Sequence, residues 1–261
     1  MKSSLYTTQL QAGLGMIDET RSLLELWQAG TDVPALFQAA LQSGRFPTMS
    51  ARRLRNVVAE CFAPRFLAGD VKPAVLLKTL GILLSAREFE QLLFTYTCRA
   101  SAVLADFVGE VYWNAYTSGR QILSNDEAKD FVTRANQDGK TLKPWSASTV
   151  RRVASYLTGC CADFGLLERG AKSVRKILHY RIEPRTAAIL SHELHFAGHG
   201  DNAIVANAVW TLFGMDRADV LNELRRLALK GLFIVQSAGD VTRIAWQCKD
   251  LEELGHVLAQ G

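Results

Sequence analysis

The residues of this sequence that point most clearly to a function are basic, and they gather between Lys143 and Arg185. This segment holds nine basic and three acidic residues and therefore carries a net charge of +6. The whole 261-residue chain carries +4, so the remainder carries −2. A local excess of positive charge is typical of surfaces that bind polyanions. The segment therefore predicts contact with nucleic acid.

Two adjacent arginines lie on a predicted helix that runs from Ser148 to Cys161. At about 100° per residue, one side of this helix is apolar, with Val150, Val153, Leu157 and Cys161. The opposite side holds Arg151, Arg152, Ser155, Thr158 and Gly159. Guanidinium groups present a planar fork of donors that suits both phosphates and base edges. The small neighbouring residues would allow close approach to a nucleic-acid backbone, whereas the alternative is an ordinary solvated basic face.

A basic turn and a strand are predicted after this helix. Phe164–Leu167 breaks the helix, Glu168–Lys176 forms the turn, and Ile177–Ile182 has strand character. Helix, helix, short strand, basic loop and strand is the order of a winged helix, in which the second helix enters a DNA groove and the wing grips the backbone. The predicted contacts outside the arginine pair are Lys143, Ser155, Arg169, Lys172, Arg175 and Lys176.

A second basic group, Arg52, Arg53 and Arg55, begins a predicted helix over Ala51–Phe62 with Ser50 as its N-cap. Pro64 is expected to end that helix. Free N–H groups and the helix dipole favour phosphate at such a position. We include Arg52 and Arg53 among the predicted nucleic-acid contacts, with solvated or ion-paired arginines as the alternative.

The fold class predicted from periodicity and turn signals is mainly α: an N-terminal helical bundle followed by winged-helix-like units with short β-hairpins. We expect residues 1–140 to form the bundle, 141–185 the basic winged-helix-like cassette, and 186–261 a C-terminal helical region. That last region repeats the pattern with a helix over Arg217–Lys230 and a hairpin of Phe233–Gln236 and Val241–Gln247. Between Asp216 and Trp246 it has five basic and four acidic residues, so this second unit is near neutral and better suited to protein contact.

The most suggestive catalytic pattern is His192, His195 and His199, whose spacing would align three imidazoles on one side of a continuous helix. Glu193 stands in H-E-x-H instead of the H-E-x-x-H of metalloproteases, and Gly198 and Gly200 are expected to end the helix. We interpret the histidines as a polar helix end or interface. The adjacent Cys160 and Cys161 are interpreted as packing. We predict no catalytic residue, metal or cofactor.

Composition sets the remaining expectations. The longest apolar stretches, Ala74–Leu84 and Ala203–Met215, are shorter than the roughly 18 to 20 residues that cross a bilayer. The N-terminus lacks the apolar run of a signal peptide. Five cysteines, an odd number without C-x-x-C spacing, favour reduced thiols. A cytoplasmic protein without membrane contact or a small-molecule substrate is therefore expected.

Several short phrases occur together in a characteristic order. They are Gly13-Leu14, Glu19-Thr20-Arg21, Ser50-Ala51-Arg52-Arg53, Asp106-Phe107-Val108, Trp145-Ser146 with Thr149, and Asp163-Phe164-Gly165-Leu166-Leu167. From about residue 10 to residue 185 the chain resembles the BrxA family of bacterial phage-defence proteins, which are encoded with BREX systems. The resemblance implies a helical accessory protein with a winged-helix element, associated with DNA and without a catalytic centre.

The leading hypothesis is a non-enzymatic accessory subunit of a BREX phage-defence system that binds double-stranded DNA and other BREX proteins. A protein–protein adaptor, in which the basic segment receives an acidic partner, is the first alternative. RNA binding by the helical bundle is the second. Trp113, Tyr112 and Tyr116 are available to stack on bases in that case, although their spacing favours a helix core.

Overall fold

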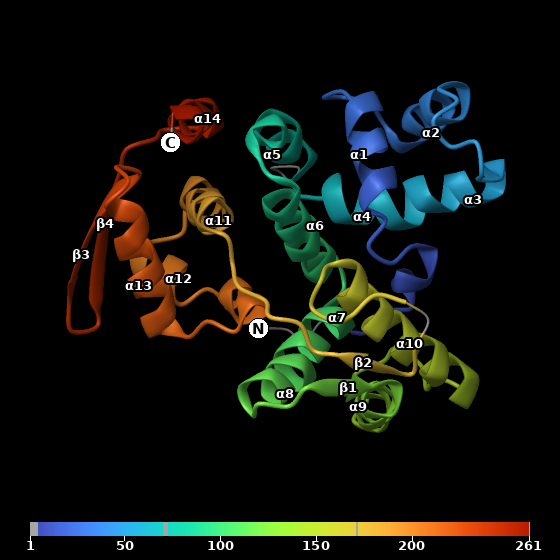
Figure 1. Cartoon of the computed structure of the whole chain (residues 1–261). Coiled ribbons are helices and arrows are strands. Elements are labelled where there is room, and N and C mark those ends of the chain that lie inside the picture. Colours follow the sequence, from blue (N-terminus) through green and yellow to red (C-terminus); the bar gives the residue numbers. More distant parts are fainter. Residues whose placement is uncertain (1–4, 70–72, 171, 261) are drawn as a thin grey trace. The chain divides into compact units, whose positions relative to one another are not determined.

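The computed structural model describes residues 5–69, 73–170 and 172–260, with no side-chain description for Gln260. The described chain is mainly helical and contains two small two-stranded antiparallel sheets, which confirms the predicted helical class (Figure 1). Its contacts define two compact units: one comprises Met1–Gly69 and Leu93–Tyr180, the other Asp70–Leu92 and Arg181–Gly261. The division of the chain at residues 140 and 185 stays a prediction.

The first unit contains most of the helices and the first sheet. Its elements are α1 (Ile17–Leu26), α2 (Val33–Gln42), α3 (Ala51–Asn56), α4 (Ala63–Phe66), the end of α6 (Ala86–Ala100), α7 (Ala102–Phe107), α8 (Trp113–Thr117), β1 (Ile122–Ser124), α9 (Asn125–Gln137), α10 (Ala147–Asp163) and β2 (Val174–Lys176). A 3₁₀ turn covers Gln9–Ala12, and π-helical turns cover Val57–Phe62 and Val108–Tyr112.

The second unit combines an early helix with the C-terminal part of the chain. Its elements are α5 (Pro73–Leu80), a 3₁₀ turn (Gly81–Leu83), the start of α6, α11 (Pro184–Phe196), α12 (Asp201–Val205), a 3₁₀ turn (Ala208–Phe213), α13 (Arg217–Ala228), β3 (Phe233–Ala238), β4 (Val241–Trp246) and α14 (Leu251–Gln260).

The helix that begins at Ser50 is longer than predicted. Ser50 caps it by accepting a hydrogen bond from the Arg53 N–H, as expected. Pro64 does not end it, because the helical backbone continues through Val57–Phe62 to Phe66. In the π-helical turn the Ala63 N–H bonds to the Val58 carbonyl, five residues back. The proline thus follows a shift in the hydrogen-bond register and occupies the first turn of α4, where its missing N–H is tolerated.

A buried clamp joins the N-terminal segment to α4 and α10. Arg65, only 6% exposed, donates hydrogen bonds from its guanidinium to the carbonyls of Gly13 and Leu14. The Gly15 N–H donates to the Asp163 carboxylate at the end of α10, with an N···O distance of 2.9 Å. A Cβ at Gly15 would lie 2.6 Å from the Cβ of Asp163. Glycine is therefore required at this point of closest approach.

The first sheet pairs β1 with β2 in antiparallel register, Leu123 lying opposite Arg175. The prediction of a strand over Ile177–Ile182 is therefore wrong. Ile177 forms only an isolated bridge to Leu167, and the paired strand lies inside the segment predicted as a basic turn. A strand needs a partner, and β1 is positioned to pair with Val174–Lys176, an interaction that local propensity does not reveal.

Around this sheet, α9 and α10 pack side by side (Figure 1). Ser124 ends β1 and caps α9 through a capping box with Glu127. At the other end of α10, Gly165 has φ +75° and the Leu166 N–H donates to the Cys161 carbonyl, which closes the helix. Phe164 then packs against Phe94, with ring centroids 5.5 Å apart.

In the second unit, β3 and β4 form a hairpin that packs against α13 (Figure 1). The predicted hairpin is confirmed, although β3 extends beyond Gln236 to Ala238. The start of α12 completes the edge of β4: Asn202 accepts a hydrogen bond from the Thr242 N–H, and Asp201 accepts one from the Ile244 N–H, each at 2.9 Å. Two side chains thus satisfy backbone N–H groups on the edge of β4, a position where a sheet edge could otherwise pair with a further strand.

His192 lies in the aromatic core of the second unit. It is 0% exposed, and its ring centroid is 4.9 Å from that of Trp246 and 5.6 Å from that of Phe233. One ring nitrogen, Nδ1, lies 2.8 Å from the Ala188 carbonyl. Burial lowers the pKa of His192 to about 4, because the charged imidazolium would lose its hydration.

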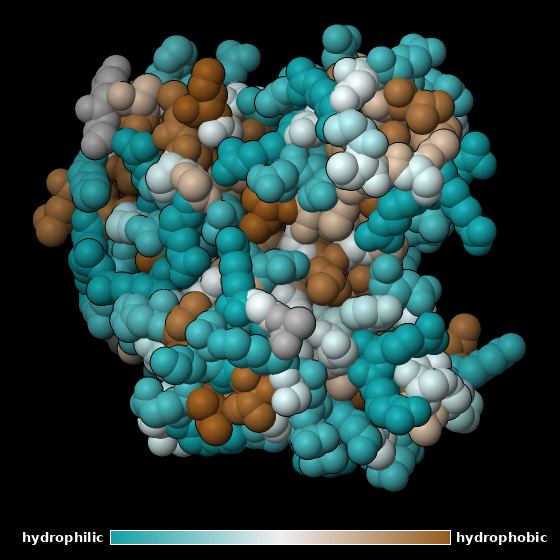
Figure 2. All heavy atoms as spheres, turned by 45° about the vertical axis from the view of Figure 1, so that its right-hand side comes forward, coloured by the Kyte–Doolittle hydropathy of each residue, from teal (hydrophilic) through white to brown (hydrophobic). Residues whose placement is uncertain are grey.

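On the face shown in Figure 2, hydrophilic side chains predominate and apolar residues form small groups separated by polar ones. The most exposed large apolar side chains of the described chain are Ile82 and Leu229, each 88% exposed. Scattered apolar side chains are normal on a protein surface. The viewed face therefore does not indicate a broad hydrophobic interface.

Replacing Gly15 with alanine should destabilise the first unit by about 1 to 3 kcal/mol, because the new Cβ overlaps Asp163. Gly109→Ala is the matched control, since a Cβ there meets no atom within 4 Å. Urea unfolding followed by circular dichroism measures both. Equal stability of the two variants would contradict the tight approach.

His192 should make the stability of the protein depend on pH in the acidic range. Its folded pKa of about 4 lies below the ordinary value of 6.5, so the neutral form stabilises the fold fully above pH 6.5, and this contribution is lost as the pH falls towards 4. Between pH 7 and pH 5 the loss is about 2 kcal/mol. Urea unfolding at pH 7 and pH 5 measures this loss in the free energy of unfolding. In His192→Phe the loss should be smaller than in wild type by about 2 kcal/mol. His199→Gln, at an exposed position, should show the same loss as wild type.

Candidate nucleic-acid interface

The exposed side of α10 carries the residues that the sequence singles out. Arg151, Arg152 and Ser155 are exposed, and Ser148 lies on the same side one turn earlier. The apolar side is buried as predicted, with Val150, Val153, Leu157 and Cys161 in the core. The amphipathic pattern of this helix is therefore confirmed, and its arginines stand at the surface.

Two residues predicted to face outward are instead buried. Thr158 is 1% exposed, and its hydroxyl donates to the Asn125 side chain at 2.5 Å. Gly159 is covered by Leu14, because a Cβ at this position would meet the Leu14 Cδ1 atom at 2.9 Å. The N-terminal segment and the start of α9 thus enclose the C-terminal half of α10. Only the first half of the helix is available to a partner.

The two arginines of α10 have no partner among the residues that the structure describes. Neither the Arg151 nor the Arg152 guanidinium forms a hydrogen bond or ion pair with another residue that the structure describes. Five N–H donors on each group therefore remain available for an external ligand. They are the two basic residues of α10, and neither forms an ion pair with a carboxylate in the described part of the chain, so their positive charge is available to a polyanion.

Most basic residues after α10 are engaged within the protein. Arg169 donates to the Asp163 carbonyl at 3.0 Å, and Lys172 forms an ion pair with Glu168 at 2.9 Å. Arg175 is only 8% exposed and donates to the Glu168 carbonyl. These three side chains therefore hold the loop between α10 and β2.

Lys176, in contrast, is exposed in β2, and its ammonium group has no hydrogen-bond or ion-pair partner among the described residues. Lys143 is also exposed, in the loop that leads into α10. This loop is held by Asn136, whose side-chain oxygen accepts hydrogen bonds from the Trp145 N–H and the Thr141 hydroxyl. Sequence reasoning did not identify Asn136 as a positioning residue, because its partners are defined only by the folded loop.

The second basic group is placed apart from α10. Arg52 is exposed and Arg53 half-buried on α3, and Figure 1 shows α3 separated from α10. The six-residue α3 begins a continuous helical stretch, and its Ser50 cap already satisfies one N-terminal donor. The fold therefore does not bring Arg52 and Arg53 together with the other predicted contacts.

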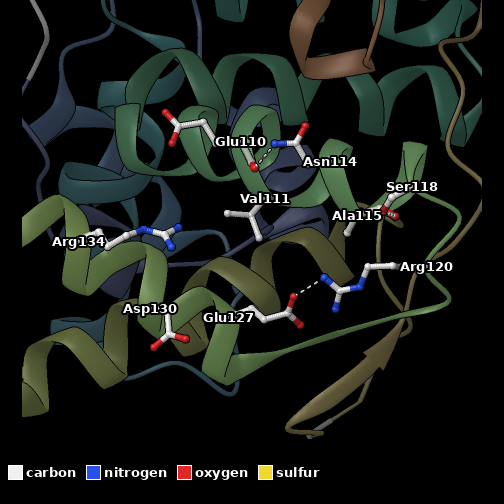
Figure 3. Close-up of a pocket in the computed structure, with 9 residues that line it drawn as sticks. All are labelled: Glu110, Val111, Asn114, Ala115, Ser118, Arg120, Glu127, Asp130 and Arg134. Atoms are coloured by element: carbon white, nitrogen blue, oxygen red, sulfur yellow. Dashed lines mark hydrogen bonds and ion pairs between the residues drawn. The ribbon is translucent and has the colours of Figure 1, made fainter.

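A polar hollow of about 270 Å³ lies between the Val108–Tyr112 turn, α8 and α9 (Figure 3). It is lined by Glu110, Val111, Asn114, Ala115, Ser118, Arg120, Glu127, Asp130 and Arg134. Arg120 and Glu127 form an ion pair across one end at 2.5 Å, and this contact lowers the pKa of the Glu127 carboxyl. Carboxylates outnumber guanidinium groups on its walls, so the hollow does not extend the basic surface of α10.

The histidines do not converge. His192 is buried, His195 stacks on Trp246 with centroids 4.3 Å apart, and the exposed His199 follows the end of α11 at Phe196. Within residues 5–69, 73–170 and 172–260, no three His, Cys, Asp or Glu side chains form a group able to hold a metal ion. The fold thus distributes the three imidazoles between core, aromatic stack and solvent.

Cys160 and Cys161 are fully buried, in agreement with their interpretation as packing residues. Burial raises the pKa of the Cys160 thiol to about 12, and that of Cys161 also lies well above its ordinary value. Both thiols therefore stay protonated at neutral pH and lack the thiolate character of reactive cysteines.

No helix in the described part of the chain is long and apolar enough to cross a membrane.

Comparison with known proteins adds one finding. A search among curated proteins gave no match. The model of the BrxA family matches residues 4–193, a range that includes the clamp, α9, α10 and the first sheet. This match covers well over half of the 261 residues and agrees with the resemblance carried by the short phrases. The chain therefore belongs to the BrxA family.

Proposed function

We propose that this protein is a non-enzymatic accessory subunit of a BREX phage-defence system and binds double-stranded DNA through α10. Membership of the BrxA family implies that the protein is a component of a BREX system. The single observation that carries the DNA-binding proposal is the pair of exposed, unpartnered arginines, Arg151 and Arg152, on the one side of α10 that is not buried.

The order of elements around α10 supports a winged-helix arrangement. From α8 the chain passes through β1, α9 and α10, then through the bridge residue Leu167 and a basic loop into β2. The strand β2 pairs with β1 on one side, and Ile177, the residue after β2, bridges to Leu167. In the chain, α10 is the element that follows α9. In winged helices the corresponding second helix enters the major groove and the loop between the last two strands contacts the backbone.

The positions of the basic side chains without ion-pair partners also support binding with α10 in the major groove. Lys143 before α10, Arg151 and Arg152 on α10, and Lys176 in β2 belong to one compact unit, and none of them forms an ion pair with another described residue. If these four side chains neutralise about four phosphates, the logarithm of affinity should fall with the logarithm of salt concentration at a slope of up to about −4.

The double variant Arg151→Ala/Arg152→Ala should bind a duplex at least about tenfold more weakly than wild type, because each arginine contact with DNA contributes roughly 1 to 3 kcal/mol. Fluorescence anisotropy with a labelled duplex at fixed salt measures the change. Circular dichroism checks the fold, which should be preserved because both side chains are exposed.

The matched control is Arg225→Ala/Arg226→Ala, which removes a neighbouring arginine pair from α13. There Arg226 is paired with Glu223 and Arg225 donates to Ser237. This variant should keep wild-type affinity. An equal loss in both variants would mean that binding reflects overall charge, and no binding by wild type would refute the proposed function. Preference for structured RNA over duplex DNA, or capture of an acidic partner that persists without nucleic acid, would support the alternatives.

Neighbouring residues of β2 should behave differently. Lys176→Ala should weaken DNA binding by a few-fold and reduce the salt slope by about 1, without loss of stability. Arg175→Ala should destabilise the fold by roughly 1 to 3 kcal/mol, because the buried Arg175 side chain and its hydrogen bond to the Glu168 carbonyl are lost. Anisotropy and urea unfolding separate the two effects, and a purely binding defect in Arg175→Ala would contradict its structural role.

A further inference from the structure

We propose that α10 reads guanine in the major groove, so that the protein discriminates between DNA sequences instead of binding phosphates alone. The feature that carries this inference is the exposed face of α10, formed by Ser148, Arg151, Arg152 and Ser155. The inference rests on the proposed DNA binding and adds a chemical specificity to it.

The four side chains share one narrow face. At about 100° per residue, they span an arc of roughly 100°. The next residues of the same stripe, Thr158 and Gly159, are enclosed by Asn125 and Leu14. The readable surface is thus confined to the first half of α10, which is the part of a recognition helix whose side chains contact base edges.

The residue sizes on this face permit a close approach. Ser148 and Ser155 flank the arginine pair with short hydroxyl side chains, so these two positions do not hold the helix away from the groove floor. Arginine is long enough to reach the base edges from such a helix. Its two parallel N–H donors match the O6 and N7 acceptors that guanine presents in the major groove.

The division of basic residues supports base reading by α10. Lys143 and Lys176 lie outside the helix and present single ammonium groups, which suit phosphates, and phosphate contacts carry no direct sequence information. Arg169, Lys172 and Arg175 already contact the protein itself. Among the residues that the structure describes between Lys143 and Arg185, the forked donors without an internal partner are those of Arg151 and Arg152.

The test begins with selection of bound duplexes from a random pool, followed by affinity measurement on a selected duplex and on an all-A·T duplex of equal length. Wild type should enrich a guanine-containing site and bind it at least about tenfold more tightly than the A·T duplex. Replacing the site's guanines with 7-deazaguanine removes the N7 acceptor while preserving base pairing. This replacement should abolish most of the preference.

The variant Arg151→Lys/Arg152→Lys keeps both charges but removes the forked donors. It should bind the A·T duplex within about threefold of wild type, retain the salt slope, and show a clearly smaller preference for the guanine site, because an ammonium group contacts O6 and N7 less specifically than the guanidinium fork does.

The outcomes separate the two proposals. Binding of all duplexes with equal affinity, or insensitivity to 7-deazaguanine, would overturn base reading while leaving DNA binding intact. An unchanged preference in the lysine variant would overturn the assignment to these arginines. Absence of binding to any duplex would refute the proposed function itself.

Discussion

The buried Arg65 guanidinium is the interaction on which the first unit depends. A charged group with so little exposure is stable in a protein interior only when its donors are satisfied, and the carbonyls of Gly13 and Leu14 do this. The same segment presents the Gly15 N–H to Asp163 and the Leu14 side chain to Gly159. One short N-terminal segment thereby ties α4 to the end of α10.

This clamp also determines which part of α10 reaches the surface. Because Leu14 and Asn125 cover its C-terminal half, the exposed basic face is restricted to the first half of the helix. The short phrases around Gly13 and Asp163, which are far apart in the sequence, meet at this point. Their shared role is structural: they position the helix, whereas the arginines on its free side are available to a ligand.

The segment Lys143–Arg185 is rich in basic residues, but contacts within the protein determine how many of them are available to bind a polyanion. The carbonyls of Asp163 and Glu168 and the Glu168 carboxylate engage Arg169, Arg175 and Lys172. A count of basic residues therefore overstates the free charge. In the described part of this region, the cations without a hydrogen-bond or ion-pair partner lie before α10, along its exposed side, and in β2.

The sequence by itself determined the helical class, the extent of α10 and its buried side, and the hairpin of β3 and β4, because these follow from local periodicity and turn chemistry. Only the tertiary structure decided the continuation of the helix past Pro64, the pairing of β2 with β1, and the burial of Thr158, Gly159 and Arg175. Each of these depends on a partner that is distant in the sequence or on a shift in backbone hydrogen bonding. Periodicity places a residue on a face of its own helix, but contacts from the rest of the chain decide whether that face meets solvent.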